Sequence, residues 1–191
     1  MKSRYITAIV CLAWVCAHAG GPATSQKSNS GGHVYLIAKA LEGTGSTVNG
    51  LSGESINGGA LDLGYKPPNW KHLSLELNTA YAEGTGVPRP DKKKASAEEA
   101  LTFRGLGLNL AYTHHFKGFS LVGKGGVKYE RERAEEPGHS PKTIEETGFA
   151  YAAGIEFPLP GNLELAVEIE GVTFDSPKGM DLLLGLKVPL R

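Results

Sequence analysis

Histidines are the side chains best suited to acid–base or nucleophilic chemistry in this sequence. Beyond the N-terminal segment they are His33, His72, His114, His115 and His139. Nucleophilic catalysis needs a hydroxyl or thiol with a base held beside it. His139 directly precedes Ser140, but Gly138 and Pro141 flank the pair in a polar stretch that is typical of a solvated loop. No catalytic residues are therefore predicted, and we expect the protein not to be an enzyme.

Metal or phosphate binding is the second chemistry to consider. His114 and His115 are adjacent, and neighbouring side chains on a tight turn rarely converge on one ion. Both cysteines, Cys11 and Cys16, fall in the N-terminal segment, so the rest of the chain offers no thiolate. The glycines of 105–107 and 123–125 lack the remainder of a phosphate-binding motif and are better explained as closely packed or interior-facing residues. We predict no metal and no cofactor.

Single charges set within apolar stretches are the remaining constellation. Glu164 and Glu168, for example, alternate with aliphatic residues in the segment 163–170. An isolated buried charge is costly, so charges of both signs that share one interior are expected to pair. Whether these charged side chains share one interior depends on the secondary-structure elements that carry them.

The N-terminal segment must be separated from those elements. Residues 1–19 resemble a secretory signal peptide, with Lys2 and Arg4 before an apolar run and Ala17-His18-Ala19 as a cleavage site. The run is shorter than the about 20 residues of a membrane-spanning helix. Residues 20–32 have the Gly- and Ser-rich composition of a flexible linker. We therefore expect a signal peptide at 1–19, a linker at 20–32 and one domain at 33–191.

The domain reads as strands, because apolar residues recur with a period of two. Leu73, Leu75 and Leu77 alternate with Glu76 and Asn78, and comparable alternation runs through 149–157, 163–170 and 182–191. The composition agrees, since 26 glycines are spread among aliphatic and aromatic residues and Gly is a poor helix former. Lys plus Arg and Asp plus Glu number 20 each, so no basic excess indicates nucleic acid.

Alternation alone fits both a soluble barrel with an apolar interior and a membrane barrel with an apolar exterior. The charges favour the membrane barrel, because its lumen would enclose them and the small Gly and Ala residues beside them leave room. Aromatic residues support it, because two belts are typical of the two bilayer interfaces. The predicted belts are Tyr65, Trp70, Tyr112, Phe119 and Phe157 at one end, and Tyr81, Phe103, Tyr129, Phe149 and Tyr151 at the other.

The connections predict the number of strands. Short joins occur at 67–69, 114–117 and 160–162, whereas long polar segments occur at 42–54, 83–99 and 131–146, with a smaller one at 175–179. Outer-membrane barrels have short periplasmic turns and longer external loops. The fold class predicted is therefore all-β, an eight-stranded antiparallel up-and-down transmembrane β-barrel with both termini periplasmic.

Several motifs resemble the OmpA-like small outer-membrane β-barrels, a family that includes OmpX-like and opacity-type proteins. They are Val34-Tyr35-Leu36-Ile37-Ala38-Lys39, Gly58-Gly59-Ala60 with Gly64-Tyr65, Asn109-Leu110-Ala111-Tyr112, Gly123-Lys124-Gly125-Gly126-Val127 and Tyr151-Ala152-Ala153-Gly154-Ile155-Glu156-Phe157. The resemblance covers 33–191. It implies a Gram-negative outer-membrane location, assembly by the barrel-assembly machinery and a lumen salt-bridge network, with Glu76 and Glu156 as acidic and Lys39 and Lys124 as basic positions. The chain departs from the family by ending in Val188-Pro189-Leu190-Arg191 rather than in an aromatic residue.

These observations favour a structural or surface-interaction protein of the outer membrane, expected to be a monomer. The predicted lumen network comprises Lys39, Asp62, Glu76, Lys124, Lys128, Glu156, Glu164, Glu168 and Lys187. A narrow porin or gated channel, in which a rearranged ion pair opens a path, is the alternative, and an outer-leaflet lipid-modifying enzyme is a distant third. Lys92, Lys93 and Lys94 are candidates for contact with lipopolysaccharide phosphates. No nucleic-acid partner is expected.

Overall fold

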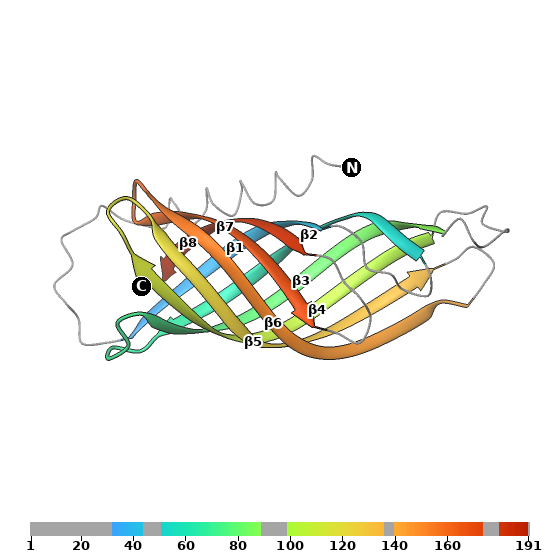
Figure 1. The fold of residues 1–191 in the computed structure, drawn as a ribbon, viewed down its shortest axis with the longest axis horizontal. Coiled ribbons are helices and arrows are strands. Elements are labelled where there is room, and N and C mark those ends of the chain that lie inside the picture. Colours follow the sequence, from blue (N-terminus) through green and yellow to red (C-terminus); the bar gives the residue numbers. More distant parts are fainter. Residues whose placement is uncertain (1–31, 44–50, 89–98, 136–139, 174–179, 191) are drawn as a thin grey trace.

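The computed structural model describes residues 32–43, 51–88, 99–135, 140–173 and 180–190, which form one closed barrel of eight strands. Each strand pairs antiparallel with its neighbours in sequence, and the first strand closes the barrel by pairing with the last (Figure 1). The predicted fold class is confirmed. The strands are β1 (His33–Gly43), β2 (Leu51–Lys66), β3 (Leu73–Pro88), β4 (Glu99–His115), β5 (Ser120–Glu135), β6 (Lys142–Leu159), β7 (Leu163–Thr173) and β8 (Asp181–Leu190).

Three short turns join strands at one end of the barrel, on the left in Figure 1. In the turn between β2 and β3, the Trp70 N–H donates to the Pro67 carbonyl at 3.0 Å. Between β4 and β5, the Phe116 N–H donates to the Phe119 carbonyl at 2.8 Å, and Gly118 takes a φ of 99°. Between β6 and β7, Gly161 and Asn162 have φ values of 80° and 62°, as a type I′ turn requires. This end is called the short-turn end below.

The strands are longer than expected at the opposite end. A tilted strand crosses a bilayer with about 9 to 11 residues, yet β2 to β6 have 16 to 18. The predicted loops 42–54, 83–99 and 131–146 are therefore too wide, because Leu51, Pro88 and Glu135 still belong to strands. Their polar composition does not stop strand formation where both faces of the wall can meet water.

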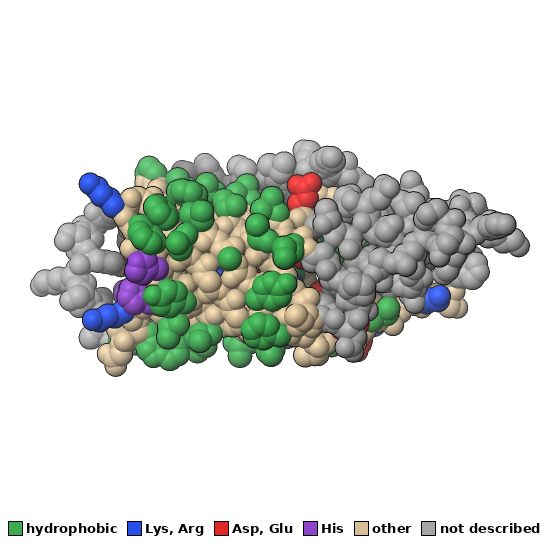
Figure 2. All heavy atoms as spheres, viewed as in Figure 1, with side chains coloured by type: hydrophobic (Ala, Val, Ile, Leu, Met, Phe, Trp, Pro, Cys, Tyr) green, Lys and Arg blue, Asp and Glu red, His purple; other side chains and the backbone are tan. Residues whose placement is uncertain are grey.

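The outward face of the barrel is apolar. In β3, Leu75 and Leu77 are 40% and 45% exposed, whereas Glu76 between them is 2% exposed. The same division holds in β4, where Leu106, Leu108 and Leu110 point outward. Figure 2 shows hydrophobic side chains over the visible face of the barrel next to the short turns. The side chains of opposite parity lie inside.

No helix within the described ranges is long and apolar enough to span a membrane. The signal peptide and linker predicted for 1–32 lie outside the described residues except for Gly32.

Candidate functional site

The interior of the barrel holds the densest group of charged side chains, and glycines on neighbouring strands make room for them. A Cβ on Gly185 would stand 2.8 Å from Cγ of Lys39, and a Cβ on Gly64 would fall on the ring of Tyr35. Gly154 is similarly close to the Glu168 side chain. Larger residues at these positions would displace the charged or aromatic side chain beside them.

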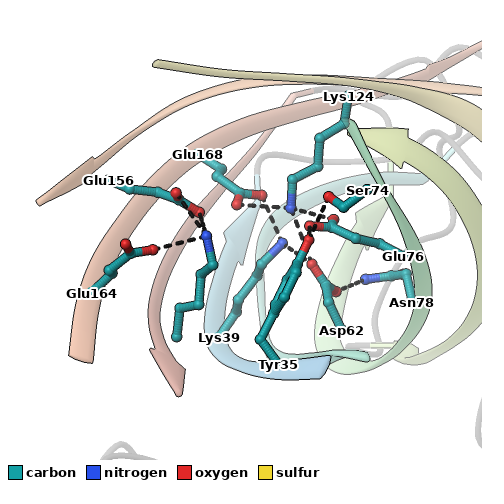
Figure 3. Close-up of polar contacts among 11 residues, drawn as sticks. Tyr35, Lys39, Asp62, Ser74, Glu76, Asn78, Lys124, Glu156, Glu164 and Glu168 are labelled. Carbon is teal, nitrogen blue, oxygen red and sulfur yellow. Dashed lines mark hydrogen bonds and ion pairs between the residues drawn. The ribbon is translucent and has the colours of Figure 1, made fainter. Parts of the chain in front are cut away.

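Five of the interior residues form what we call the central cluster: Lys39, Asp62, Glu76, Lys124 and Glu168 (Figure 3). Lys124 Nζ lies 2.6 Å from a Glu76 oxygen, 2.9 Å from Glu168 and 3.2 Å from Asp62. Lys39 Nζ lies 2.5 Å from Asp62 and 2.6 Å from Glu168. Every member is nearly fully buried. Because three carboxylates face two ammonium groups, the cluster carries one more negative than positive formal charge.

Neutral side chains complete the hydrogen bonding of two of these carboxylates. The Tyr35 hydroxyl donates to Glu76 Oε1 at 2.7 Å, and Ser74 Oγ lies 2.7 Å from the same hydroxyl. Asn78 Nδ2 donates to Asp62 Oδ1 at 2.5 Å. Buried carboxylates are stabilised by such donors, because water is not there to solvate them.

Two smaller groups of ion pairs lie along the same interior. Towards the short turns, Lys187 Nζ contacts Glu156 at 2.9 Å and Glu164 at 2.8 Å, and it stands 4.8 Å from the centre of the Tyr35 ring. Tyr35 thus touches both this group and the central cluster. Farther from the short turns, Lys128 Nζ on β5 contacts Glu170 on β7 at 2.5 Å.

An apolar group, called the apolar layer here, follows the central cluster in the direction away from the short turns. Its buried members come from β1, β2, β3, β4 and β8: Leu41, Ile56, Ala60, Ala82, Leu101, Phe103 and Leu183. Along β1, Leu41 comes after Lys39, and along β4, Phe103 is farther from the short-turn end than Asn109. On the wall formed by β8, β1, β2, β3 and β4, the interior is therefore polar near the short turns and apolar farther from them.

A family comparison identifies the architecture. The family described as outer membrane protein beta-barrel domain matches residues 8–188, which is most of the chain. The chain belongs to this family. An outer-membrane location follows from that membership, and the apolar outward face of this outer-membrane barrel is the face that lipid requires. No curated protein matches the sequence.

Solved outer-membrane barrels have the same fold at low sequence identity. OprG of Pseudomonas aeruginosa is similar with a TM-score of 0.66 and 11% identity, over 87% of this chain and all of that one. Ail, the attachment invasion locus protein of Yersinia pestis, was solved with the heparin analogue sucrose octasulfate; it has a TM-score of 0.55 and 13% identity, over 83% of this chain and 97% of that chain. Neisserial surface protein A has a TM-score of 0.54 and 15% identity, over 82% of this chain and 96% of that chain.

The structure of this outer-membrane barrel places the predicted lumen residues as follows. Each of them takes part in an ion pair inside the barrel, and seven of the eight strands supply them: Lys39, Asp62, Glu76, Lys124, Lys128, Glu156, Glu164, Glu168 and Lys187. Sequence reasoning missed Glu170, Asn78 and Tyr35. Glu170 and Asn78 share the parity of Glu168 and Glu76, so the alternation could have added them. Tyr35 shares the parity of Lys39 in β1, so the same alternation could have placed it inside the barrel.

The predicted aromatic belts need one correction. Tyr65, Tyr81, Tyr112, Tyr129, Phe149, Tyr151 and Phe157 are exposed on the outward face, and Trp70 is exposed in the turn between β2 and β3. Phe119 is half-buried in the turn between β4 and β5 and stacks on Phe116 at 4.9 Å. Phe103 was wrongly assigned to a belt. It is 5% exposed and belongs to the apolar layer, because its parity in β4 is opposite to that of Leu106 and Leu108.

Other residues considered above are placed as follows. Gly123 faces outward with open space where a Cβ would stand, so it is neither interior nor closely packed. His115 Nδ1 lies 2.9 Å from Ser120 Oγ across the hairpin, a pairing that sequence reasoning did not find. Among the described residues, no carboxylate accepts a hydrogen bond from the other ring nitrogen of His115, as a catalytic triad would need. No group of three metal-binding side chains is found in the described part of the chain. Lys92, Lys93, Lys94 and His139 lie outside the described residues.

Proposed function

We propose that this protein is a closed outer-membrane barrel with a structural or surface-interaction role. The observation that carries the proposal is the filled interior, in which the central cluster and the apolar layer occupy successive parts of the lumen. A water-filled path would have to separate buried ion pairs and also wet the apolar layer. Both steps are unfavourable, since each leaves buried groups without partners or exposes apolar surface to water.

A surface role is supported by the shape of the wall. The strands β2 to β6 extend past the length that a bilayer needs, at the end away from the short turns. By the general rule for such barrels, that end faces the cell exterior and both termini are periplasmic. The structurally similar proteins include an attachment protein and a surface protein. Their low sequence identity to this chain supports a shared fold alone.

Single-channel recording in planar bilayers tests the closed barrel. We expect no discrete openings from purified protein whose folding has been verified, in a bilayer where a large porin added afterwards conducts normally. Reproducible openings from the folded protein would reject the closed interior and leave the membrane location intact.

A narrow gated channel is the second candidate, and one observation favours it. Lys124 lies within ion-pair distance of three carboxylates, so it can exchange one partner for another without becoming unpaired. If the wild type conducts, Glu76→Gln should change the open probability, because it removes the nearest partner of Lys124. Identical openings in both proteins would argue against a gate at this cluster.

We also propose that Lys92, Lys93 and Lys94, between β3 and β4, contact lipopolysaccharide phosphates. Replacing the three lysines with glutamine should weaken lipopolysaccharide binding and reduce its dependence on ionic strength. Unchanged binding would remove the proposal without affecting the closed barrel.

A further inference from the structure

Basic side chains gather at the short-turn end of the barrel, and all of them are exposed except Lys66, which is half-buried. Lys66 ends β2, Lys71 and His72 precede β3, His114 lies at the end of β4, and Lys117 is in the following turn. We call these five residues the basic rim. The acidic side chains described at this end, Glu156 and Glu164, face the interior and both pair with Lys187. At the opposite end, by contrast, exposed charges alternate in sign, as in the pairs Arg131–Glu145 and Arg133–Glu135.

Specific contacts hold the two turns of the basic rim side by side. The Thr113 N–H donates to the His72 carbonyl at 2.7 Å, and His72 Nδ1 donates back to the Thr113 carbonyl at 3.0 Å. The His72 ring stacks on the His114 ring at 6.0 Å and lies 5.7 Å from the ring of Tyr112, which is on the lipid-facing surface. Figure 2 shows the histidines next to hydrophobic side chains, with lysines at the same end.

Aromatic side chains place the basic rim at an interfacial depth. Trp70 directly precedes Lys71, and Phe116 directly precedes Lys117; both aromatic side chains are exposed. Phe116 also packs edge-on against His114 at 4.7 Å. Exposed Trp, Tyr and Phe beside cationic residues are typical of the depth at which lipid headgroups lie.

We propose that the basic rim binds the phosphate groups of anionic glycerophospholipids in the leaflet at the short-turn end. The exposed Lys71 and Lys117 supply ammonium donors that suit a phosphate, and the aromatic residues contact the upper acyl chains of the same lipid. The hydrogen bond from Nδ1 of His72 to the Thr113 carbonyl fixes the orientation of this ring within the basic rim. The inference rests on the membrane placement of the barrel and adds a headgroup preference to it.

Trp70 provides a reporter within the site. The sequence has two tryptophans, so Trp14→Phe in the full chain leaves Trp70 as the single one. The folded variant is reconstituted into phosphatidylcholine vesicles that contain a minor fraction of phosphatidylglycerol, with bromine on the acyl chains of one lipid or the other. Quenching of Trp70 by each brominated lipid then measures which lipid is enriched beside it.

We expect phosphatidylglycerol to be enriched beside Trp70 by at least about fivefold, because the attraction of a single nearby lysine, about 1 kcal/mol, already implies that factor. Added salt should reduce the enrichment. Combining Lys71→Gln with Lys117→Gln should abolish it, whereas Lys142→Gln, an exposed lysine at the other end, should leave it unchanged.

Two results would overturn the inference: quenching in proportion to the bulk lipid fractions, or enrichment that survives the double substitution. Failure of the membrane placement would look different. In that case neither brominated lipid would quench Trp70. Quenching in the double variant is interpreted only if that variant inserts into vesicles as the wild type does. The salt dependence of quenching in the Trp14→Phe protein tests the inference independently of the double variant.

Discussion

Lys124 places one ammonium group among three buried carboxylates, so its removal should be the most damaging single change in the lumen. Lys124→Met keeps much of the side-chain length and leaves Glu76 without its ion-pair partner. We expect a loss of about 3 to 5 kcal/mol in the free energy of unfolding, as is usual when half of a buried pair is removed. Urea unfolding of the protein in lipid vesicles measures the change.

The control for that prediction is Lys142→Met, which changes the same residue type at an exposed position of β6. It should alter the free energy of unfolding by less than about 0.5 kcal/mol. Equal effects of the two substitutions would mean that the central cluster does not contribute to stability.

Two glycines of β5 make a matched pair for packing. A Cβ on Gly126 would collide with the Leu108 carbonyl oxygen and Asn109 on the neighbouring strand, whereas a Cβ on Gly123 would meet nothing within 4 Å. Gly126→Ala should therefore cost about 1 to 3 kcal/mol of unfolding free energy, and Gly123→Ala should be neutral or slightly stabilising. The same urea titration compares them. The packing would be contradicted if both variants were as stable as the wild type.

Residue roles were predictable where parity decides them. Glu76, Glu168 and Lys124 could be assigned to the interior because their neighbours in sequence suit the opposite face. Phe103 could not be, because an aromatic residue suits both a lipid interface and an apolar interior, and the apolar layer forms only when five strands meet. The pairing of Lys39 with Glu168 could not be predicted either, because the two residues are 129 positions apart in the sequence.

At the scale of the elements, strand β4 shows the contrast between the outward and inward surfaces of the barrel. Leu106, Leu108 and Leu110 are all exposed outward, and Leu108 is the middle one. Leu108→Arg should destabilise the lipid-embedded protein by about 2 to 4 kcal/mol, because it moves a charge into the apolar part of the bilayer. On a soluble protein, the same exposed substitution would change the unfolding free energy by less than about 0.5 kcal/mol.

Thr143→Arg serves as the element-scale control, because Thr143 is exposed at the end of β6 away from the short turns. We expect it to have little effect in vesicles. A mild effect of Leu108→Arg in the same titration would be incompatible with β4 facing lipid at its centre.

The extent of the strands was less predictable than their number. Turn residues such as Gly161 and Asn162 mark short connections clearly, and each predicted short join overlaps an observed turn. The join predicted at 114–117 is displaced, because His114 and His115 belong to β4 and the turn occupies 116–119. The strand ends away from the short turns had no such marker of a turn in the sequence. Residues 131–135 continue β5 as alternating charges, a pattern that resembles a loop but also fits a wall with water on its outer face.

At the scale of the whole molecule, closure of the barrel should make the native state resist detergent. In the half of the barrel next to the short turns every strand pairs on both sides, including β8 with β1, so no strand edge is open there for unfolding to begin. In sodium dodecyl sulfate, the unheated protein from the outer-membrane fraction should migrate differently from the boiled protein. Identical migration, together with recovery from a soluble fraction, would contradict the membrane barrel.

The contact between Lys39 on β1 and Glu168 on β7 also has a kinetic consequence. These side chains meet only after nearly the whole chain has been ordered, because β1 must reach β8 before the ring is complete. Contacts between residues so far apart in sequence form slowly. Until they form, an assembling chain in the bilayer has an open strand edge and a central cluster that lacks its Lys39–Glu168 ion pair. Ring closure and completion of the central cluster therefore coincide, so we expect assembly to end in a slow, cooperative final step with no long-lived half-barrel.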